Sequence, residues 1–132
     1  HRNDIRFLGV DLEDWISSET TKEIKSSVVC RNEEAFLRQS PLTFEQAFTL
    51  AFSAKESLFK ALYMDVGYYF DFDAARITDI SKDERKFRIE LNIDLTPELT
   101  KGRCFTGYYH TDSQRILTMV VEKVQISLAN TD

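Results

Sequence analysis

Two short stretches of the sequence carry side chains that could do chemistry together. The first, GVDLE at residues 9–13, places Asp11 and Glu13 two positions apart. In a β-strand this spacing puts both carboxylates on one face, about 7 Å apart along the chain, so both could reach a hard divalent cation directly or through water. The same spacing is also typical of the solvated edge of a sheet, so the pair alone does not establish a metal site.

The second stretch, AFSAKESLFKALY at residues 51–63, places charge within an amphipathic helix. On a helical wheel with Phe48 at the core direction, Glu56 lies about 80° and Lys60 about 120° away, at the border of the buried stripe. Their i,i+4 spacing is also that of a surface ion pair. Lys55 lies about 20° from the core direction, where an unpaired ammonium is costly. Either its stem extends so that the charge reaches water, or the helix borders a polar cleft.

The N-terminal third of the chain predicts one strand followed by two helices. DIRFLGVDLE, residues 4–13, is rich in strand formers and alternates, with Val10 and Leu12 on the face opposite the acidic pair. SSETTKEIKSSV, residues 17–28, begins with capping residues and continues with helix formers. RNEEAFLRQS, residues 31–40, predicts a second helix that ends before Pro41.

The rest of the chain predicts one long helix and a set of strands. Thr43 could cap a helix that Gly67 ends. Its apolar stripe consists of Phe44, Phe48, Ala51, Phe52, Phe59, Leu62 and Val66. Four strand-like segments separated by polar turns follow, at residues 76–80, 86–94, 102–110 and 115–124. The prediction is an α+β fold in which an antiparallel sheet packs on the long helix, within a single domain over residues 1–132.

Composition limits the classes of function. The 132 residues are 42% hydrophobic, enough for one core, and the net charge of −5 gives no support for binding nucleic acid. Cys30 and Cys104 have no metal-site spacing, so we expect free thiols. Because no apolar run could span a bilayer and no signal peptide is recognised, we expect a cytoplasmic protein without a transmembrane segment. The chain does not begin with Met, so we also expect a processed chain or a fragment.

Together the two stretches resemble the paired motifs of the 4′-phosphopantetheinyl transferase superfamily. That family has a strand reading (V/I)G(I/V)D, often followed by x-E, and some forty-odd residues later a helix reading (F/W)-(S/C/T)-x-K-E-(A/S)-x-x-K. The matching segments here are LGVDLE and FSAKESLFK. The segment TLAFSAKES, residues 49–57, is similar to the enterobactin-synthetase members of the larger, Sfp-like subgroup. The resemblance implies a pseudo-dimeric fold of two α+β halves, of which this chain resembles the C-terminal half.

The resemblance also implies an activity. Members transfer the 4′-phosphopantetheine arm of coenzyme A to a serine of an apo acyl or peptidyl carrier protein, so the implied partners are coenzyme A and such a carrier. The enterobactin-type likeness favours siderophore or other non-ribosomal peptide biosynthesis. By motif position, Asp11, Glu13 and Glu56 are the implied Mg²⁺ ligands. Glu56 and Lys60 are the implied catalytic residues, and Lys60 and Lys55 are implied to bind coenzyme A.

Three alternatives to an active transferase stay open. The N-terminal half that completes the coenzyme A pocket in this subgroup has no counterpart in the sequence, and neither does its Ser-x-x-His segment. The chain could therefore be a catalytically incomplete fragment, or it could pair with an N-terminal half or a second copy. It could also be a carrier-protein binding module without transfer activity. A generic Mg²⁺-dependent phosphohydrolase site would use the same carboxylates.

Overall fold

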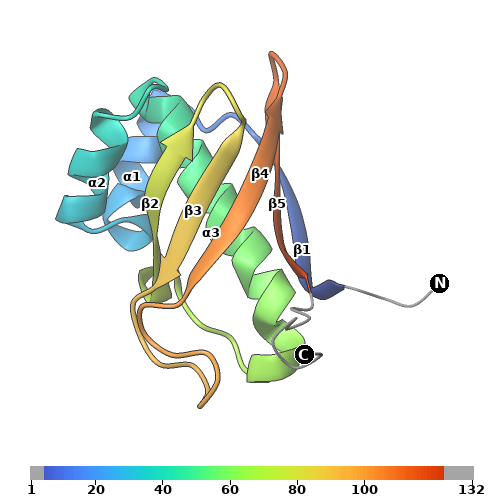
Figure 1. Ribbon diagram of the computed structural model, residues 1–132. Helices are drawn as coiled ribbons and strands as arrows, with labels where there is room; N and C mark the ends of the chain where they lie inside the picture. The colour runs from blue at the N-terminus through green and yellow to red at the C-terminus, as the bar shows by residue number, and fades with distance from the viewer. Residues whose placement is uncertain (1–4, 124–132) are drawn as a thin grey trace.

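A five-stranded antiparallel sheet with a long helix across one face forms the architecture of the computed structural model, which describes residues 5–123 (Figure 1). The sheet order is β1-β5-β4-β3-β2, so β2 to β5 form a meander and the first strand adds beside the last. The elements are β1 (Ile5–Asp14), α1 (Ser18–Val28), α2 (Arg31–Arg38), α3 (Phe44–Val66), a short 3₁₀ helix (Phe72–Ala74), β2 (Ala75–Ser81), β3 (Lys86–Leu91), β4 (Cys104–Thr111) and β5 (Arg115–Lys123). The predicted α+β fold, with an antiparallel sheet packed on the long helix, is confirmed.

The predicted bounds of the elements agree closely with the structure, with two shortened strands. The strand predicted over 86–94 ends at Leu91, because the Asn92 N–H turns to bond the Ala74 carbonyl at 2.7 Å. The strand predicted from residue 102 begins at Cys104, because Gly102 adopts a left-handed conformation with φ of 93°. The outermost residues of the first and last predicted strands, Asp4 and Val124, lie outside the described residues.

Local capping chemistry explains where α3 begins and ends. The Thr43 side chain accepts a hydrogen bond from the Gln46 N–H, and the Gln46 side chain accepts one from the Thr43 N–H, which forms a capping box. At the other end Gly67 is left-handed, with φ of 80°, and its N–H bonds the Tyr63 carbonyl at 2.7 Å. Both predicted ends are confirmed, and α3 therefore has a fixed position along the sheet.

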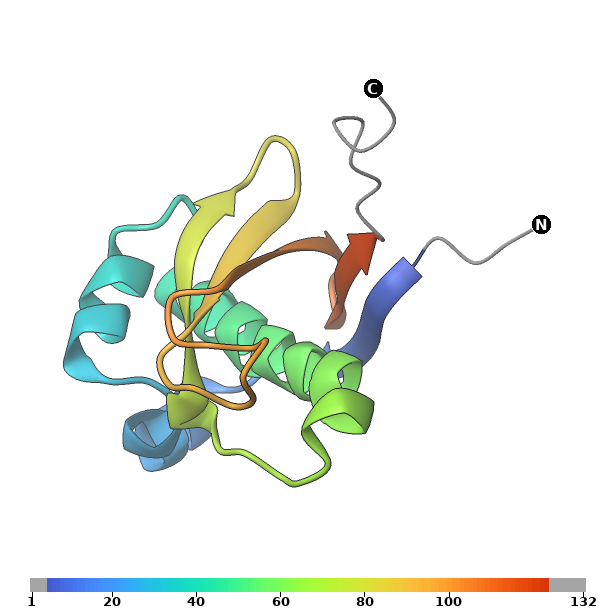
Figure 2. The ribbon, with the colours of Figure 1, turned by 60° about the horizontal axis from the view of Figure 1, so that its bottom comes forward.

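The face of α3 that packs on the sheet differs from the predicted one. Toward β1 and β5 the helix presents Ser53, Ser57 and Ala61, which lie about 140° to 220° from Phe48 on the wheel. The aromatic stripe faces the other side, where Phe52 stacks on Phe72. Figures 1 and 2 show the reason, since α1 and α2 gather at the N-terminal end of α3 beside β2 and cover the helix there. A helix covered on two sides has two buried faces, and the wheel detected only the more apolar one.

Close approach between α3 and β1 requires a glycine at position 9. A Cβ atom there would lie 1.9 Å from the Ser57 carbonyl oxygen and 2.6 Å from the Ala61 nitrogen, and backbone atoms cannot rotate away. We expect Gly9→Ala to destabilise the chain by roughly 3 kcal/mol, the upper end of the usual cost of overpacking, as measured by urea unfolding. Val10→Ala, on the exposed face of the same strand, is the control. Equal stability of the two variants would show that the helix can shift away from the strand.

Two further expectations can be compared with the structure. Cys30 and Cys104 are both exposed and free, as predicted. Among the helices in the described part of the chain, none is long and apolar enough to cross a membrane.

Candidate functional site

Strand β1 and helix α3 bring four of the predicted site residues into one neighbourhood. Asp11 and Glu13 share the β1 face that is turned toward α3, and Asp11 is only 7% exposed. Lys60, one turn after Glu56, donates from Nζ to Asp11 Oδ1 and to the Val10 carbonyl, each at 3.1 Å. Helix and strand therefore meet at an acidic cluster of Asp11, Glu13 and Glu56 with Lys60 on its border.

Burial and mutual repulsion raise the pKa values of two carboxylates in the acidic cluster. Burial, a hydrogen bond with Asp11, and the negative charges of Asp11 and Glu56 raise the pKa of Glu13 to about 7, while Lys60 acts in the opposite direction. Burial and the charge of Asp11 also raise the pKa of Glu56, again opposed by Lys60. One ammonium thus faces three carboxylates, and the acidic cluster holds an excess of negative charge.

The donor set of the acidic cluster suits magnesium. Mg²⁺ takes hard oxygen ligands, usually one or two carboxylates completed by water and substrate phosphate. A divalent cation would also relieve the repulsion that, together with burial, raises the pKa of Glu13. In the described part of the chain, no three His, Cys, Asp or Glu side chains already stand in a metal-binding arrangement. Lys60 instead contacts one oxygen of Asp11. The assignment of Asp11, Glu13 and Glu56 as magnesium ligands stays a prediction.

A dependence on pH follows from the raised pKa of Glu13. We expect the affinity for Mn²⁺, used as a spectroscopic substitute for Mg²⁺, to rise as the pH increases through about 7, because Glu13 must lose its proton to bind the cation. Titrations followed by electron paramagnetic resonance on either side of that pH measure the effect.

Stability of the metal-free chain should follow the opposite trend. A folded-state pKa above the unfolded value of 4.5 means that the contribution of Glu13 is fully present below 4.5 and is lost as the pH rises through about 7. Glu13→Gln should remove the rise in Mn²⁺ affinity near pH 7 and weaken the stability trend, to which Glu56 also contributes through its raised pKa. Mn²⁺ affinity that is constant across this range in the parent chain would show that Glu13 is not a ligand.

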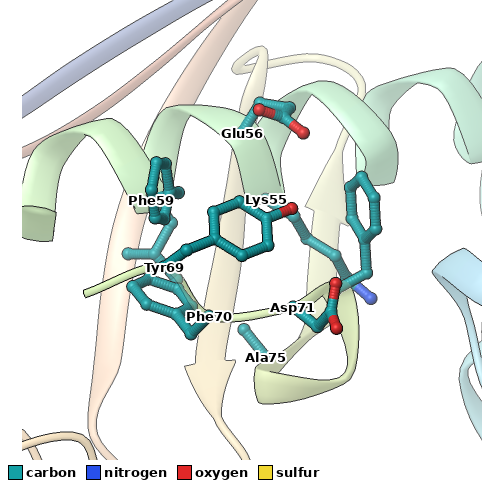
Figure 3. A pocket seen from close by; sticks show the side chains of 9 residues that line it. Lys55, Glu56, Phe59, Tyr69, Phe70, Asp71 and Ala75 are labelled. Carbon is teal, nitrogen blue, oxygen red and sulfur yellow. The ribbon is translucent and has the colours of Figure 1, made fainter.

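Lys55 lies apart from the acidic cluster. Its Nζ donates to Glu33 Oε1 and to the Val28 carbonyl, each at 2.7 Å, and the side chains of Lys55 and Glu33 are 4% and 1% exposed. The alternative in which Lys55 extends to water is therefore wrong. Figure 3 shows its ammonium directed away from the Glu56 carboxylate. Its role in binding coenzyme A stays a prediction.

Sequence reasoning missed Glu33, the partner of Lys55. Glu33 lies in α2, and its second oxygen accepts a hydrogen bond from the Ile77 N–H of β2 at 2.7 Å, so one carboxylate joins α2, α3 and β2. In the sequence it stands beside Glu34, which bonds Lys25 and Arg38 near the surface. No local signal separates the two neighbours. The position of Lys55 close to the core direction of the helical wheel is the one feature of the sequence that indicates a buried acidic partner.

A small pocket opens beside Glu56, between α3 and the segment that follows it (Figure 3). Aromatic rings form much of its wall. The centroid of the Phe59 ring lies 4.7 Å from the ring centroid of Tyr69 and 5.2 Å from that of Phe70. The full lining is Lys55, Glu56, Leu58, Phe59, Tyr69, Phe70, Asp71, Phe72 and Ala75. The pocket therefore combines an apolar wall with carboxylates, and Tyr69 and Asp71 are additions that the motifs did not indicate.

Similarity to known proteins extends over most of the chain. Residues 7–118 match the family model described as the 4′-phosphopantetheinyl transferase superfamily. The chain is 42% identical over 74 residues to enterobactin synthase component D of Salmonella typhi, across 56% of this chain and 31% of that protein. It is 40% identical over 63 residues to the protein of that name from Escherichia coli K12, across 46% of this chain and 31% of that protein. The matched segment is thus under a third of each relative's length. With the family model covering most of its residues, the chain belongs to the 4′-phosphopantetheinyl transferase superfamily.

Proposed function

We propose that this chain carries the magnesium- and phosphate-binding part of an enzyme that transfers 4′-phosphopantetheine from coenzyme A to a serine of an apo acyl or peptidyl carrier protein. The observation that carries the proposal is the meeting of Asp11, Glu13, Glu56 and Lys60 at the contact of β1 with α3, within the segment that matches the family. The names of the relatives support a role in siderophore biosynthesis of the enterobactin type, and hence a cytoplasmic site of action.

Each residue of the acidic cluster has a distinct role in this proposal. Asp11, Glu13 and Glu56 would hold Mg²⁺ against the coenzyme A pyrophosphate, where the cation offsets negative charge on the reacting phosphate. Lys60, whose side chain is half exposed, would bind a phosphate oxygen of coenzyme A as a point charge. Glu56 would also take the proton of the attacking serine, directly or through water.

The proposed reaction is a nucleophilic displacement at the β-phosphorus of coenzyme A. The serine oxygen of the carrier forms a bond to the β-phosphorus of coenzyme A, the bond from that phosphorus to the oxygen of 3′,5′-ADP breaks, and Glu56 takes the serine proton. These assignments place the proton acceptor and the phosphate-binding lysine one helical turn apart.

The outer face of the sheet supports the proposal that residues 1–132 form one half of a pseudo-dimeric enzyme. Leu8, Val10 and Leu12 of β1 are 48%, 43% and 52% exposed. They pair across the sheet with Val121, Met119 and Leu117 of β5, so the exposed side chains form one continuous apolar face. Faces of this kind mark protein interfaces. We propose that a similar N-terminal half covers it, which makes this chain the C-terminal half.

Intact-mass analysis of an apo carrier protein tests the function. The carrier is incubated with coenzyme A, Mg²⁺ and this chain within its full-length protein, and the expected result is the mass increase of one phosphopantetheine arm. Hydrolysis of simple phosphate esters without modification of the carrier would favour the phosphohydrolase alternative. Binding of coenzyme A or the carrier without transfer would favour a binding module. Light scattering then measures the mass of the isolated chain in solution. A dimer would indicate that a second copy covers the apolar face, and a monomer would favour an N-terminal half.

A further inference from the structure

A line of buried hydroxyl groups runs between α3 and the sheet and ends at Asp11. Ser53 Oγ donates to Asp11 Oδ2 at 2.9 Å and lies 2.8 Å from Thr118 Oγ1 of β5. Ser57 Oγ lies 2.6 Å from the same Thr118 oxygen. All three hydroxyl residues are 0% exposed, so no water competes for these bonds. The line therefore joins one turn of α3 to β5 and to a carboxylate of the acidic cluster.

The Asp11 carboxylate sets the direction of the hydrogen bond that Ser53 makes to it. Ser53 gives its one hydroxyl proton to Asp11 Oδ2, so in its contact with Thr118 the Ser53 oxygen acts as the acceptor. The Ser57 hydroxyl has two acceptors on the same residue of β5, the Thr118 carbonyl oxygen at 3.2 Å and the Thr118 hydroxyl at 2.6 Å. Aligned hydroxyls in a dry environment polarise one another, and bonds to an ionised acceptor are stronger than neutral ones.

Asp11 is held at both of its oxygens. Ser53 binds Oδ2 from the buried side, while Lys60 binds Oδ1 from the side of the acidic cluster. A carboxylate has about four lone-pair sites, so with the bonds from Ser53 and Lys60 and the hydrogen bond with Glu13 at least one site stays free for a cation. Groups that bind a metal-ligating residue from behind set its orientation, and their loss commonly weakens metal binding by roughly 10- to 100-fold.

We infer that Ser53 is a positioning residue. Its hydroxyl orients the Asp11 carboxylate toward the divalent cation, and Thr118 holds the Ser53 hydroxyl in place. This inference rests on the proposed function. It also gives a reason for a small hydroxyl at the second position of FSAKESLFK, where the side chain must fit between helix and strand and still donate to Asp11.

Ser57 supplies a matched control. It lies on the same helix, is equally buried and bonds the same Thr118 oxygen, but its side chain does not contact Asp11. If the hydroxyls only fasten α3 to the sheet, then Ser53→Ala and Ser57→Ala should behave alike. If Ser53 positions Asp11, the two variants should lose similar stability in urea unfolding and differ only at the acidic cluster.

Two measurements on the isolated chain decide between these outcomes. Without metal, NMR coupling constants report the Asp11 side-chain rotamer, which should stay single in the parent and in Ser57→Ala and become averaged in Ser53→Ala. With Mn²⁺, Ser53→Ala should bind roughly 10-fold more weakly than Ser57→Ala. An unchanged Asp11 rotamer in Ser53→Ala would overturn the inference. Equal Mn²⁺ binding by the parent and by Asp11→Asn would overturn the proposed metal site instead. The rotamer measurement is made without metal, so it tests the role of Ser53 independently of that site.

Discussion

Glu33→Ala is expected to destabilise the chain by about 3 to 5 kcal/mol, because it leaves the buried ammonium of Lys55 without a counterion. It also removes the acceptor of the Ile77 N–H, which is buried beneath α2. Burial raises the pKa of Glu33 and lowers that of Lys55, and the contact between them opposes both shifts, so each charge depends on the other. Urea unfolding of the parent and the variant measures the loss.

The neighbouring residue Glu34 is the control for this prediction. Its carboxylate bonds Lys25 and Arg38, but this pair of contacts lies near the surface, so Glu34→Ala should cost less than about 1 kcal/mol. Replacing both members of the buried pair, as Glu33→Gln with Lys55→Met, should recover part of the stability lost in Glu33→Ala, because no isolated charge remains. Equal losses for Glu33→Ala and Glu34→Ala would mean that Lys55 finds another partner or reaches water.

Local geometry predicted the two halves of the acidic cluster separately, and the resemblance to the 4′-phosphopantetheinyl transferase superfamily implied that they form one site. Alternation along a strand put Asp11 and Glu13 on one face, and the helical period put Glu56 and Lys60 on successive turns. Thr43 and Gly67 determine the ends of α3 through their own backbone chemistry, so these bounds were also predicted correctly. All of these inferences depend on neighbours within four residues along the chain, where the sequence specifies the geometry directly.

Contacts between distant parts of the chain were not predictable in the same way. The pairing of Lys55 with Glu33 depends on how α2 docks against α3, and nothing around Glu33 distinguishes it from Glu34. The small face of α3 was missed because Ser53, Ser57 and Ala61 carry little hydrophobicity, although the absence of large side chains is what lets the helix approach Gly9. Hydrophobic periodicity finds bulky buried faces and overlooks tightly packed small ones.

The outward apolar face of β1 reverses the usual arrangement of a sheet that a helix covers on one side. Val10 and Leu12 lie opposite the acidic pair, as predicted, but it is Asp11 that is buried under α3 and the aliphatic side chains that are exposed. The two faces of β1 therefore have different roles. One face carries the carboxylates of the acidic cluster, and the other carries the apolar side chains suited to an interface. The proposed N-terminal half would bury the apolar face.

Asp11→Asn and Glu56→Gln should each abolish most of the transfer activity while leaving the fold intact. Both changes keep the shape of the side chain and remove an anionic oxygen, so Mg²⁺ binds more weakly, and Glu56→Gln also removes the proposed proton acceptor. Loss of a general base alone lowers rates by about 100- to 10,000-fold. The measurement is the rate of phosphopantetheine addition to an apo carrier, followed by intact mass, with urea unfolding of each variant as a check on folding.

Asp14→Asn is the matched control, since Asp14 ends the same strand but its side chain is 81% exposed and faces Arg115, away from the acidic cluster. It should retain full activity and metal affinity. Lys60→Ala separates the remaining roles, because the Lys60 side chain is half exposed and the buried Asp11 keeps its hydrogen bond from Ser53, so the loss of stability should be smaller than that of Glu33→Ala. It should therefore weaken coenzyme A binding without unfolding the chain. If Asp11→Asn and Glu56→Gln bind Mg²⁺ with coenzyme A as tightly as Asp14→Asn does, the carboxylates at the contact of β1 with α3 are not the metal ligands. If Lys60→Ala binds coenzyme A as the parent does, Lys60 only neutralises Asp11, and the pyrophosphate must be bound elsewhere.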